Sequence, residues 1–259
     1  MTPMTPFAAL HHGAAPLLLP NAWDHASAAA LVARGFPAVG TTSLGVAAAA
    51  GLPDGSSATR EETLRLALVL GSGPGLLSVD AEDGYSDDPE EVAAFARQLA
   101  AVGAVGVNLE DRLGDPVRHA ARIAAVKAAV PGLFVNARTD THWLGDGSED
   151  PRRRLDLYQE AGAEGVFVPG LTGPREIEAL VKDLDVPLNV LHSPAGPGLA
   201  RLAELGVRRV SLGSLLYRVA LGAALDAVDG IAGGRVPAGT VPSYGEVDAL
   251  ARRDPGRHC

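Results

Sequence analysis

The sequence predicts an α/β fold of the (β/α)8 TIM-barrel type. Short aliphatic runs suited to buried strands alternate with longer segments in which apolar residues recur every three or four positions, the spacing of a helix. This alternation requires parallel strands joined by crossovers, and such strands are buried on both faces. About eight repeats of strand and helix favour a closed barrel.

Each expected strand is a run of small aliphatic residues, and each expected helix has an apolar stripe. The clearest helices are residues 90–102 (EEVAAFARQLAAV) and 174–184 (PREIEALVKDL). The expected strands, in chain order, are residues 17–19, 37–41, 76–80, 104–110, 133–137, 165–168, 187–191 and 207–212.

Glycines and capping residues mark where the helices end and begin. The segments ARGFPAV, AAVGAVGV, EAGAEGVFV and AELGVRRVSL each place a glycine between a helix end and the next strand, where a left-handed residue is favoured. Open doubly wound sheets also place glycines between helices and strands, so this pattern is shared by both fold types. Asp88 before Pro89, and Asp150 before Pro151, are typical of helix N-caps. No linker divides residues 1–259, so a single domain is expected.

Composition narrows the functional classes. The net charge is -9 and no Lys/Arg block occurs, which argues against nucleic-acid binding. No apolar run is long enough to cross a membrane. The single cysteine, Cys259, leaves no internal disulfide or thiolate zinc site, and the first residues do not read as a secretory signal. A cytoplasmic protein is expected.

Polar side chains gather where the expected strands end, and in a barrel these carboxyl ends form the active site. Asp80, Glu82 and Glu110 bring carboxylates from adjacent strands together, an arrangement that a cation would stabilise. Oxygen-only ligation favours Mg²⁺, with Mn²⁺ as the second choice. Alternatively, some of these acids pair with Arg112 or Arg138, or cap the next helix.

Other strand-end residues are candidates for substrate binding and catalysis. Arg138 could clamp a carboxylate through two N–H groups, or it could form a structural ion pair with Glu110 or Asp140. Tyr85 is an acid/base candidate, although a lone tyrosine is often a pocket wall. His25, His142 and His192 are isolated. The candidate substrate-binding residues are Thr42, Ser43, Leu44, Gly45, Arg138 and Asn189.

These residues resemble the motifs of the isocitrate lyase/phosphoenolpyruvate mutase superfamily. Residues 79–85 (VDAEDGY) resemble its metal motif D-x-D-x-G-Y-G, residues 108–112 (NLEDR) its L-E-D strand, and residues 137–140 (ARTD) its arginine strand. Residues 43–46 (SLGV) and 51–54 (GLPD) resemble its S-G-G-G-V and G-x-x-D stretches. The resemblance extends over residues 18–217.

The resemblance implies a modified barrel that binds Mg²⁺ and a pyruvate-like acid and reacts through an enolate. It implies that Asp80 ligates or supports the metal, that Glu82 and Glu110 hold its waters, and that residues 42–45 seat the substrate's carboxylate and oxo group. It also gives Asp54 a place in the site and Arg138 a charge-stabilising role. A homotetramer or homodimer with an exchanged terminal helix is implied as well.

Three departures from the superfamily pattern limit what it implies. Glu82 stands where the metal motif has its second Asp, and Ser86 replaces its final Gly. The K-K-C-G-H loop that supplies the lyases with a thiol acid is absent, because residues 113–116 (LGDP) lead directly to the next helix. The Lys and Asn of the mutase gating loop are not visible either.

The expected function is that of a metal-dependent lyase or decarboxylase of a small 2-oxo dicarboxylic acid, of which oxaloacetate is the simplest example. Decarboxylation needs an electron sink more than an acid on a loop. Three alternatives stay open: P–C bond chemistry of the phosphonopyruvate hydrolase or phosphoenolpyruvate mutase type, a 2-oxo acid binding protein without turnover, and another metal-dependent barrel aldolase.

Overall fold

Nine parallel strands form one sheet that curls into a nearly closed barrel, as the sequence predicts. The computed structural model describes residues 4–145, 149–237 and 239–251. The strand order is β1-β9-β8-β7-β6-β5-β4-β3-β2. The strands are β1 Leu17–Leu19, β2 Asn21–Ala22, β3 Ala38–Thr41, β4 Leu76–Asp80, β5 Ala104–Glu110, β6 Phe134–Arg138, β7 Gly165–Val168, β8 Leu188–Leu191 and β9 Arg209–Ser211.

Pro20 separates β1 from β2, and these two short strands together occupy one strand position of the barrel. Strand β1 pairs with β9, and β2 pairs with β3, so the two short strands connect the edges of the sheet. Proline cannot donate a hydrogen bond, but the Pro20 carbonyl still accepts one from Gly40 N at 2.8 Å. The Asn21 side chain donates to Thr41 O at 2.6 Å and accepts from Leu212 N at 3.1 Å, which joins the two sides of the closure.

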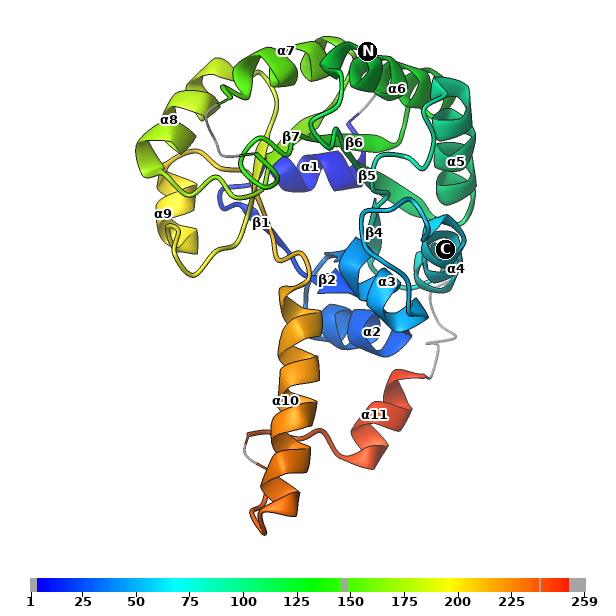
Figure 1. The fold of residues 1–259 in the computed structure, drawn as a ribbon, viewed down its shortest axis with the longest axis vertical. Coiled ribbons are helices and arrows are strands. Elements are labelled where there is room, and N and C mark those ends of the chain that lie inside the picture. The colour runs from blue at the N-terminus through cyan, green and yellow to red at the C-terminus, as the bar shows by residue number, and fades with distance from the viewer. Residues whose placement is uncertain (1–3, 146–148, 238, 252–259) are drawn as a thin grey trace.

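Helices surround the barrel (Figure 1). Helix α5 begins at Pro89 with Asp88 as its N-cap, as predicted, whereas α7 begins after Pro151 and Asp150 accepts a hydrogen bond from Arg152 N. The helices are α1 Pro6–Ala9, η1 Leu10–His12, α2 His25–Ala33, α3 Ser43–Ala50, α4 Arg60–Gly71, α5 Pro89–Ala101, α6 Pro116–Ala129, α7 Arg152–Glu160, α8 Pro174–Asp183, α9 Leu199–Glu204, α10 Leu215–Ala232 and α11 Tyr244–Leu250.

The predicted helix-ending glycines adopt the left-handed conformation. Gly35, Gly103, Gly162 and Gly206 have φ values of 90°, 104°, 99° and 88°. Because glycine has no Cβ, it reaches this region without steric cost and turns the chain back toward the next strand. The four glycine-containing segments therefore form the same helix-to-strand turn at four places around the barrel.

The short helix α1 closes the amino-terminal end of the barrel. Phe7 is buried against Phe134 with ring centroids 5.4 Å apart, and His11 stacks on the same ring at 4.3 Å. Leu17, Ala38 and Phe134 of the same cluster are the first residues of their strands. Among the described residues, this end is filled by Phe7, His11 and apolar strand residues, whereas the carboxyl ends of the strands hold a large cavity.

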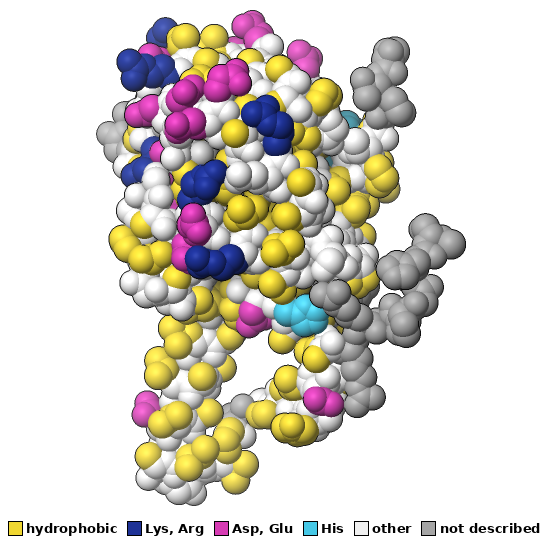
Figure 2. Space-filling view, turned by 90° about the vertical axis from the view of Figure 1, so that its right-hand side faces the viewer, with side chains coloured by type: hydrophobic (Ala, Val, Ile, Leu, Met, Phe, Trp, Pro, Cys, Tyr) yellow, Lys and Arg dark blue, Asp and Glu magenta, His cyan; other side chains and the backbone are white. Residues whose placement is uncertain are grey.

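Helix α10 leaves the barrel and projects away from it, with α11 beside it (Figure 1). Figure 2 shows hydrophobic side chains over both projecting arms. On α10 these include Val219, Leu225, Val228 and Ile231, each more than half exposed. His25 Nε2 lies 3.0 Å from Leu250 O and ties the end of α11 to α2. Among the described residues, no helix meets the length and apolarity of a membrane span.

Candidate active site

A cavity of about 510 Å³ opens at the carboxyl ends of the strands. Its polar part is formed at the ends of β3, β4, β5 and β6 by residues that include Ser43, Asp80, Glu110 and Arg138. Its other part has apolar walls, among them Phe167, Leu191 and Leu215. Size and placement fit the substrate site of a barrel enzyme, in which side chains from several strands converge.

Asp80 ends β4 and faces the first turn of α3. Its Oδ2 accepts a hydrogen bond from Ser43 N at 3.1 Å, and its own N–H bonds to Thr41 Oγ1 at 2.8 Å. Residues 43–50 form helix α3, which was not among the helices expected from the sequence. The N–H groups of a helix's first turn have no partners within the helix, so this end of α3 remains suited to an anion.

Glu82 does not line the cavity, but its charge acts on Glu110 and that of Asp80 acts on it, so the three carboxyl groups lie near one another as expected. It has a φ of 46°, and its carboxylate accepts hydrogen bonds from Ser57 N at 3.0 Å and from Thr59 Oγ1. The side chain is 1% exposed, and burial raises its pKa despite these hydrogen bonds. Glu82 therefore anchors the segment of residues 51–59, which carries Asp54.

Tyr85 also lies outside the cavity. Its hydroxyl is 2.9 Å from Thr63 Oγ1, and its ring packs edge-on against Phe95 at 5.1 Å. Burial raises the pKa of the phenol further above its ordinary value. This placement corresponds to the packing role left open from the sequence, and we do not retain Tyr85 as an acid/base candidate.

Glu110, Arg138 and Asp140 form a buried ion-pair chain along the cavity wall. Arg138 Nη1 lies 2.9 Å from Glu110 Oε2, and Arg138 Nε lies 2.6 Å from Asp140 Oδ1. Burial raises the pKa of Glu110 to about 8, although Arg138 opposes the shift and Asp80 adds to it. Burial also raises the pKa of Asp140, whose Oδ2 is buried without a hydrogen-bond partner.

Asp54 reaches the cavity from the segment between α3 and α4, as the resemblance implies. Burial raises its pKa, the Ser43 side chain partly offsets the shift, and the nearby charge of Asp80 adds to it. Four carboxyl groups in and around this cavity thus have raised pKa values, chiefly because they are buried and in smaller part because their negative charges lie near one another.

Two predicted substrate residues lie beneath the cavity. Asn189 is 1% exposed, and its Nδ2 donates to Ser211 Oγ at 3.0 Å; it does not itself line the cavity. Gly45 is buried in α3, where an added Cβ would lie 2.7 Å from Thr42 Cγ2 and 3.2 Å from Trp23 Cβ. Thr42, Ser43 and Leu44 line the cavity as expected.

Several polar groups of the cavity floor were not singled out from the sequence. Asn21, Asn108 and Ser211 line the cavity, and Arg209 lies fully buried below them. Arg209 donates to Asn108 Oδ1 at 3.1 Å and to Ser211 Oγ at 3.2 Å. All four residues lie in strands, so a polar residue within or next to an aliphatic run was the sequence feature that could have identified them.

The residues at this site fit a hard divalent cation held largely through water. No group of three or more His, Cys, Asp or Glu side chains in the described part of the chain is arranged as a direct metal cage. Asp80 and Glu110 supply carboxylate oxygens, and burial together with the nearby charges of Asp80, Asp140 and Glu82 raises the pKa of Glu110 even though Arg138 contacts it. Mg²⁺ keeps several waters and uses few carboxylates, which suits this donor set.

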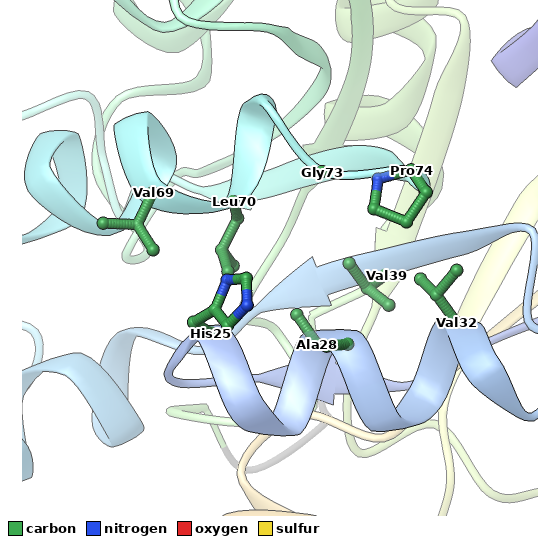
Figure 3. A pocket seen from close by; sticks show the side chains of 10 residues that line it. His25, Ala28, Val32, Val39, Val69, Leu70, Gly73 and Pro74 are labelled. Atoms are coloured by element: carbon green, nitrogen blue, oxygen red, sulfur yellow. The ribbon is translucent and has the colours of Figure 1, made fainter. Parts of the chain in front are cut away.

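A second pocket is much smaller and lies on the outside of the barrel between α2 and α4 (Figure 3). Its volume is about 30 Å³, and apolar side chains such as Val32, Val39 and Leu70 surround it. That space holds roughly one water molecule, so the pocket is a packing gap and not a substrate site.

Comparison with known proteins identifies the family. The phosphoenolpyruvate phosphomutase family model matches residues 7–232. An uncharacterized protein of Mycobacterium tuberculosis H37Rv is 44% identical over 93% of both chains. The oxaloacetate decarboxylase of Paraburkholderia xenovorans is 32% identical, over 59% of this chain and 56% of its own.

Solved structures agree with this assignment. A putative phosphonomutase from Burkholderia cenocepacia has a TM-score of 0.80 and 35% identity, covering 86% of this chain and 96% of its own. A phosphonopyruvate hydrolase solved with oxalate and Mg²⁺ has the same fold, with a TM-score of 0.82, 24% identity, and coverage of 94% and 93%. The chain therefore belongs to the phosphoenolpyruvate mutase family, within the isocitrate lyase/phosphoenolpyruvate mutase superfamily.

Proposed function

We propose that this protein is a Mg²⁺-dependent lyase or decarboxylase acting on a small 2-oxo dicarboxylic acid of the oxaloacetate type. The observation that carries the proposal is the meeting of three features in one cavity: the carboxylates of Asp80 and Glu110, the first turn of α3, and the Arg138 guanidinium. Binding and activating a 2-oxo acid requires hydrogen-bond donors around its carboxylate and a positive charge beside its oxo group. Mg²⁺, held by Asp80 and through water by Glu110, would supply positive charge that stabilises the developing enolate.

The chain's own residues orient the substrate and stabilise its charge. The N–H of Leu44 in the first turn of α3, next to the Ser43 N–H that Asp80 occupies, would bind the 2-oxo carboxylate. Arg138 is fixed by Glu110 and Asp140, so its charge is already in place and needs no rearrangement during the reaction. In decarboxylation of oxaloacetate, the C3–C4 bond breaks and CO₂ leaves. The electron pair of the broken bond stays with C3 and forms the enolate, which then takes a proton at C3 to give pyruvate.

The short connection after β5 favours decarboxylation over the reactions of the isocitrate lyase type. Residues Asp111–Asp115 lead directly into α6, and no cysteine occurs there. Cleavage of the isocitrate type uses a positioned acid to protonate the carbanion that is released, whereas the enolate left by loss of CO₂ is delocalised onto the oxo oxygen and can take its proton from water. The similarity to an oxaloacetate decarboxylase supports the same choice.

The test is turnover by the purified protein with Mg²⁺ and oxaloacetate, followed by pyruvate formation. We expect activity that EDTA removes and that Mg²⁺ or Mn²⁺ restores. Malyl-type acids and phosphonopyruvate serve as competing substrates in the same assay. Absence of metal-stimulated turnover on all of them, together with thermal stabilisation by a 2-oxo acid plus Mg²⁺, would instead identify a binding protein without turnover.

P–C bond chemistry is the second candidate, and the similarity to a putative phosphonomutase favours it. The same carboxylate seat and cationic wall would serve phosphonopyruvate. Phosphate release from phosphonopyruvate, at a rate above pyruvate formation from oxaloacetate, would establish this reaction in place of decarboxylation. Retro-aldol release of pyruvate from 4-hydroxy-2-oxo acids would identify the aldolase alternative.

We also propose that α10 packs against a second copy of this chain in a homodimer or homotetramer. The helix contains 18 residues, of which only Gly230 is buried. Val228 is 65% exposed and Ile231 63%, and apolar residues on a projecting helix are a typical mark of a subunit interface. Leu215 and Arg218, at the start of the same helix, line the cavity, so assembly would also steady one wall of the site.

A further inference from the structure

A second polar cavity, which we call the side cavity, lies outside the barrel beside the active site. Its volume is about 360 Å³, within the range of small-ligand pockets. The connection after β4, the connection after β5 and the first turns of α6 form its walls. It contains three guanidinium groups, from Arg112, Arg118 and Arg122, and the imidazole of His119.

Four aspartates also line the side cavity, and the two nearest α6 are already engaged. Asp111 Oδ2 accepts from Tyr158 OH at 2.7 Å and from Arg154 Nη1 at 3.1 Å, while its Oδ1 accepts from Leu113 N at 3.0 Å. Asp115 is the N-cap of α6 and accepts from Val117 N at 2.9 Å. These carboxylates stabilise the loop and the helix start.

The other two aspartates are engaged as well. Asp83 Oδ1 accepts from Tyr85 N at 3.0 Å and from Ser57 Oγ at 3.2 Å, and its Oδ2 lies 3.5 Å from Arg112 Nη1. Asp87 forms an ion pair with Arg122. Each of the four carboxylates therefore already contacts at least one hydrogen-bond donor of the protein.

The unused hydrogen-bonding capacity of the side cavity belongs mainly to donors. Arg118 is exposed and has no ion-pair or hydrogen-bond partner among the described residues. Arg122 is 8% exposed, and its Nε has no partner. His119 is 1% exposed, and neither ring nitrogen makes a hydrogen bond of normal geometry. A buried polar atom without a partner is costly, and these two side chains line the side cavity beside Arg118.

We propose that the side cavity binds the phosphate group of a small anion. Arg118 and Arg122 lie one helical turn apart on α6, and Arg112 approaches from the connection after β5. Donors from two elements can surround a tetrahedral group with acceptors in several directions, whereas a planar carboxylate would engage one guanidinium fork. The positive end of α6 adds to the attraction.

Arg112 lines both cavities, so the side cavity shares a wall with the active site. Arg112 has a left-handed backbone, with φ of 48°, and the next residue, Leu113, has φ of 60°. Two consecutive non-glycine residues in this region hold the guanidinium between the cavities. A bound phosphate would therefore fix Arg112 on the side-cavity face of the shared wall.

The experiment is calorimetric titration of the full-length protein with inorganic phosphate and with glycerol 3-phosphate, in buffer containing Mg²⁺. We expect saturable binding that Arg118→Gln weakens by roughly tenfold, because one charge-assisted contact is lost. Arg175→Gln is the matched control. Arg175 is also exposed, unpaired among the described residues, and located in the first turn of a helix that begins with proline, but it lies outside the side cavity.

Tighter binding of glycerol 3-phosphate than of inorganic phosphate would identify a phosphate ester as the ligand, and equal binding would identify free phosphate. Either result supports the proposal when Arg118→Gln reduces it. The proposal is overturned if neither compound binds, if Arg118→Gln and Arg175→Gln bind equally well, or if acetate binds as tightly as phosphate. Because the readout is binding, it is independent of whether the active site turns over oxaloacetate.

Discussion

The backbone N–H of Ser43 donates a 3.1 Å hydrogen bond to Oδ2 of Asp80, which joins the start of α3 to the end of β4. This contact places the anion-binding end of a helix directly beside a carboxylate. Without a cation, the negative charge of Asp80 would repel a 2-oxo acid. With a cation bound to Asp80, the cation and the start of α3 would both attract it. The contact therefore makes the charge of Asp80 central to the site.

Asp80→Ala is expected to abolish metal-dependent turnover, with a loss of at least about 100-fold in kcat, because the carboxylate that holds the cation is removed. Steady-state kinetics across a Mg²⁺ titration is the measurement. Asp185→Ala is the matched control, since Asp185 is exposed and only its backbone N–H forms a hydrogen bond. Turnover of Asp80→Ala equal to that of the control would refute the assigned site.

Arg138→Lys is expected to lower kcat by about 100-fold while the protein still folds. Arg138 contacts Glu110 and Asp140 through different nitrogens, and a lysine ammonium cannot reproduce that planar fork. The comparison of kcat with KM distinguishes the roles. A change confined to KM would mean that Arg138 binds substrate without stabilising the charge that develops in the reaction.

Gly45→Ala is expected to raise KM several-fold and to destabilise the fold by about 1–3 kcal/mol, because its Cβ would lie 2.7 Å from Thr42 Cγ2 and shift the start of α3. Chemical denaturation and substrate kinetics measure the two effects. Gly132→Ala serves as the control, since a Cβ there meets nothing within 4 Å. Equal behaviour of both variants would show that α3 tolerates the added methyl group.

The contribution of His11 to the free energy of unfolding is expected to fall as pH drops below about 6.5, whereas the raised pKa of Glu110 acts in the opposite direction. Burial holds the pKa of His11 at about 3 in the folded protein, against 6.5 for an exposed histidine. Between these values the unfolded chain binds a proton that the folded chain does not, so acid favours unfolding by about 2–3 kcal/mol at pH 4.5. Urea titrations at pH 7.5 and 4.5 measure it.

His11→Leu should reduce this acid sensitivity even though it loses the stack on Phe134 and the 3.0 Å hydrogen bond to Phe7 O. The quantity compared is the difference in unfolding free energy between the two pH values, which cancels a constant loss of packing. If wild type and variant lose the same free energy on acidification, a group other than His11 causes the loss.

Val228→Asp is expected to reduce the oligomer to smaller species, because it places a charge among the exposed apolar residues of α10. Light scattering coupled to size-exclusion chromatography gives the mass. Leu68→Asp on α4 is the control, since Leu68 is 60% exposed at a site away from α10. A monomeric wild-type protein, or an unchanged mass for Val228→Asp, would rule out this interface.

The sequence by itself determined the order of strands and helices, because burial on both faces of a parallel strand imposes a local composition. The predicted bounds of β4, β5 and β7 match the structure, and the helix-ending glycines have the expected left-handed backbone. It did not reveal α3. After Ser43, the segment SLGVAAAA is apolar and has no periodic pattern, so neither a helix nor a strand was indicated.

Side-chain direction at the site was decided only by the tertiary structure. Strand alternation places Asp80 and Glu82 on the same face, but β4 ends at Asp80, and the left-handed backbone of Glu82 turns its carboxylate toward Ser57. Residue spacing likewise left Arg138 with a choice between Glu110 and Asp140, whereas the folded chain brings both carboxylates to it. Such contacts depend on distances between segments far apart in the sequence, which local patterns do not encode.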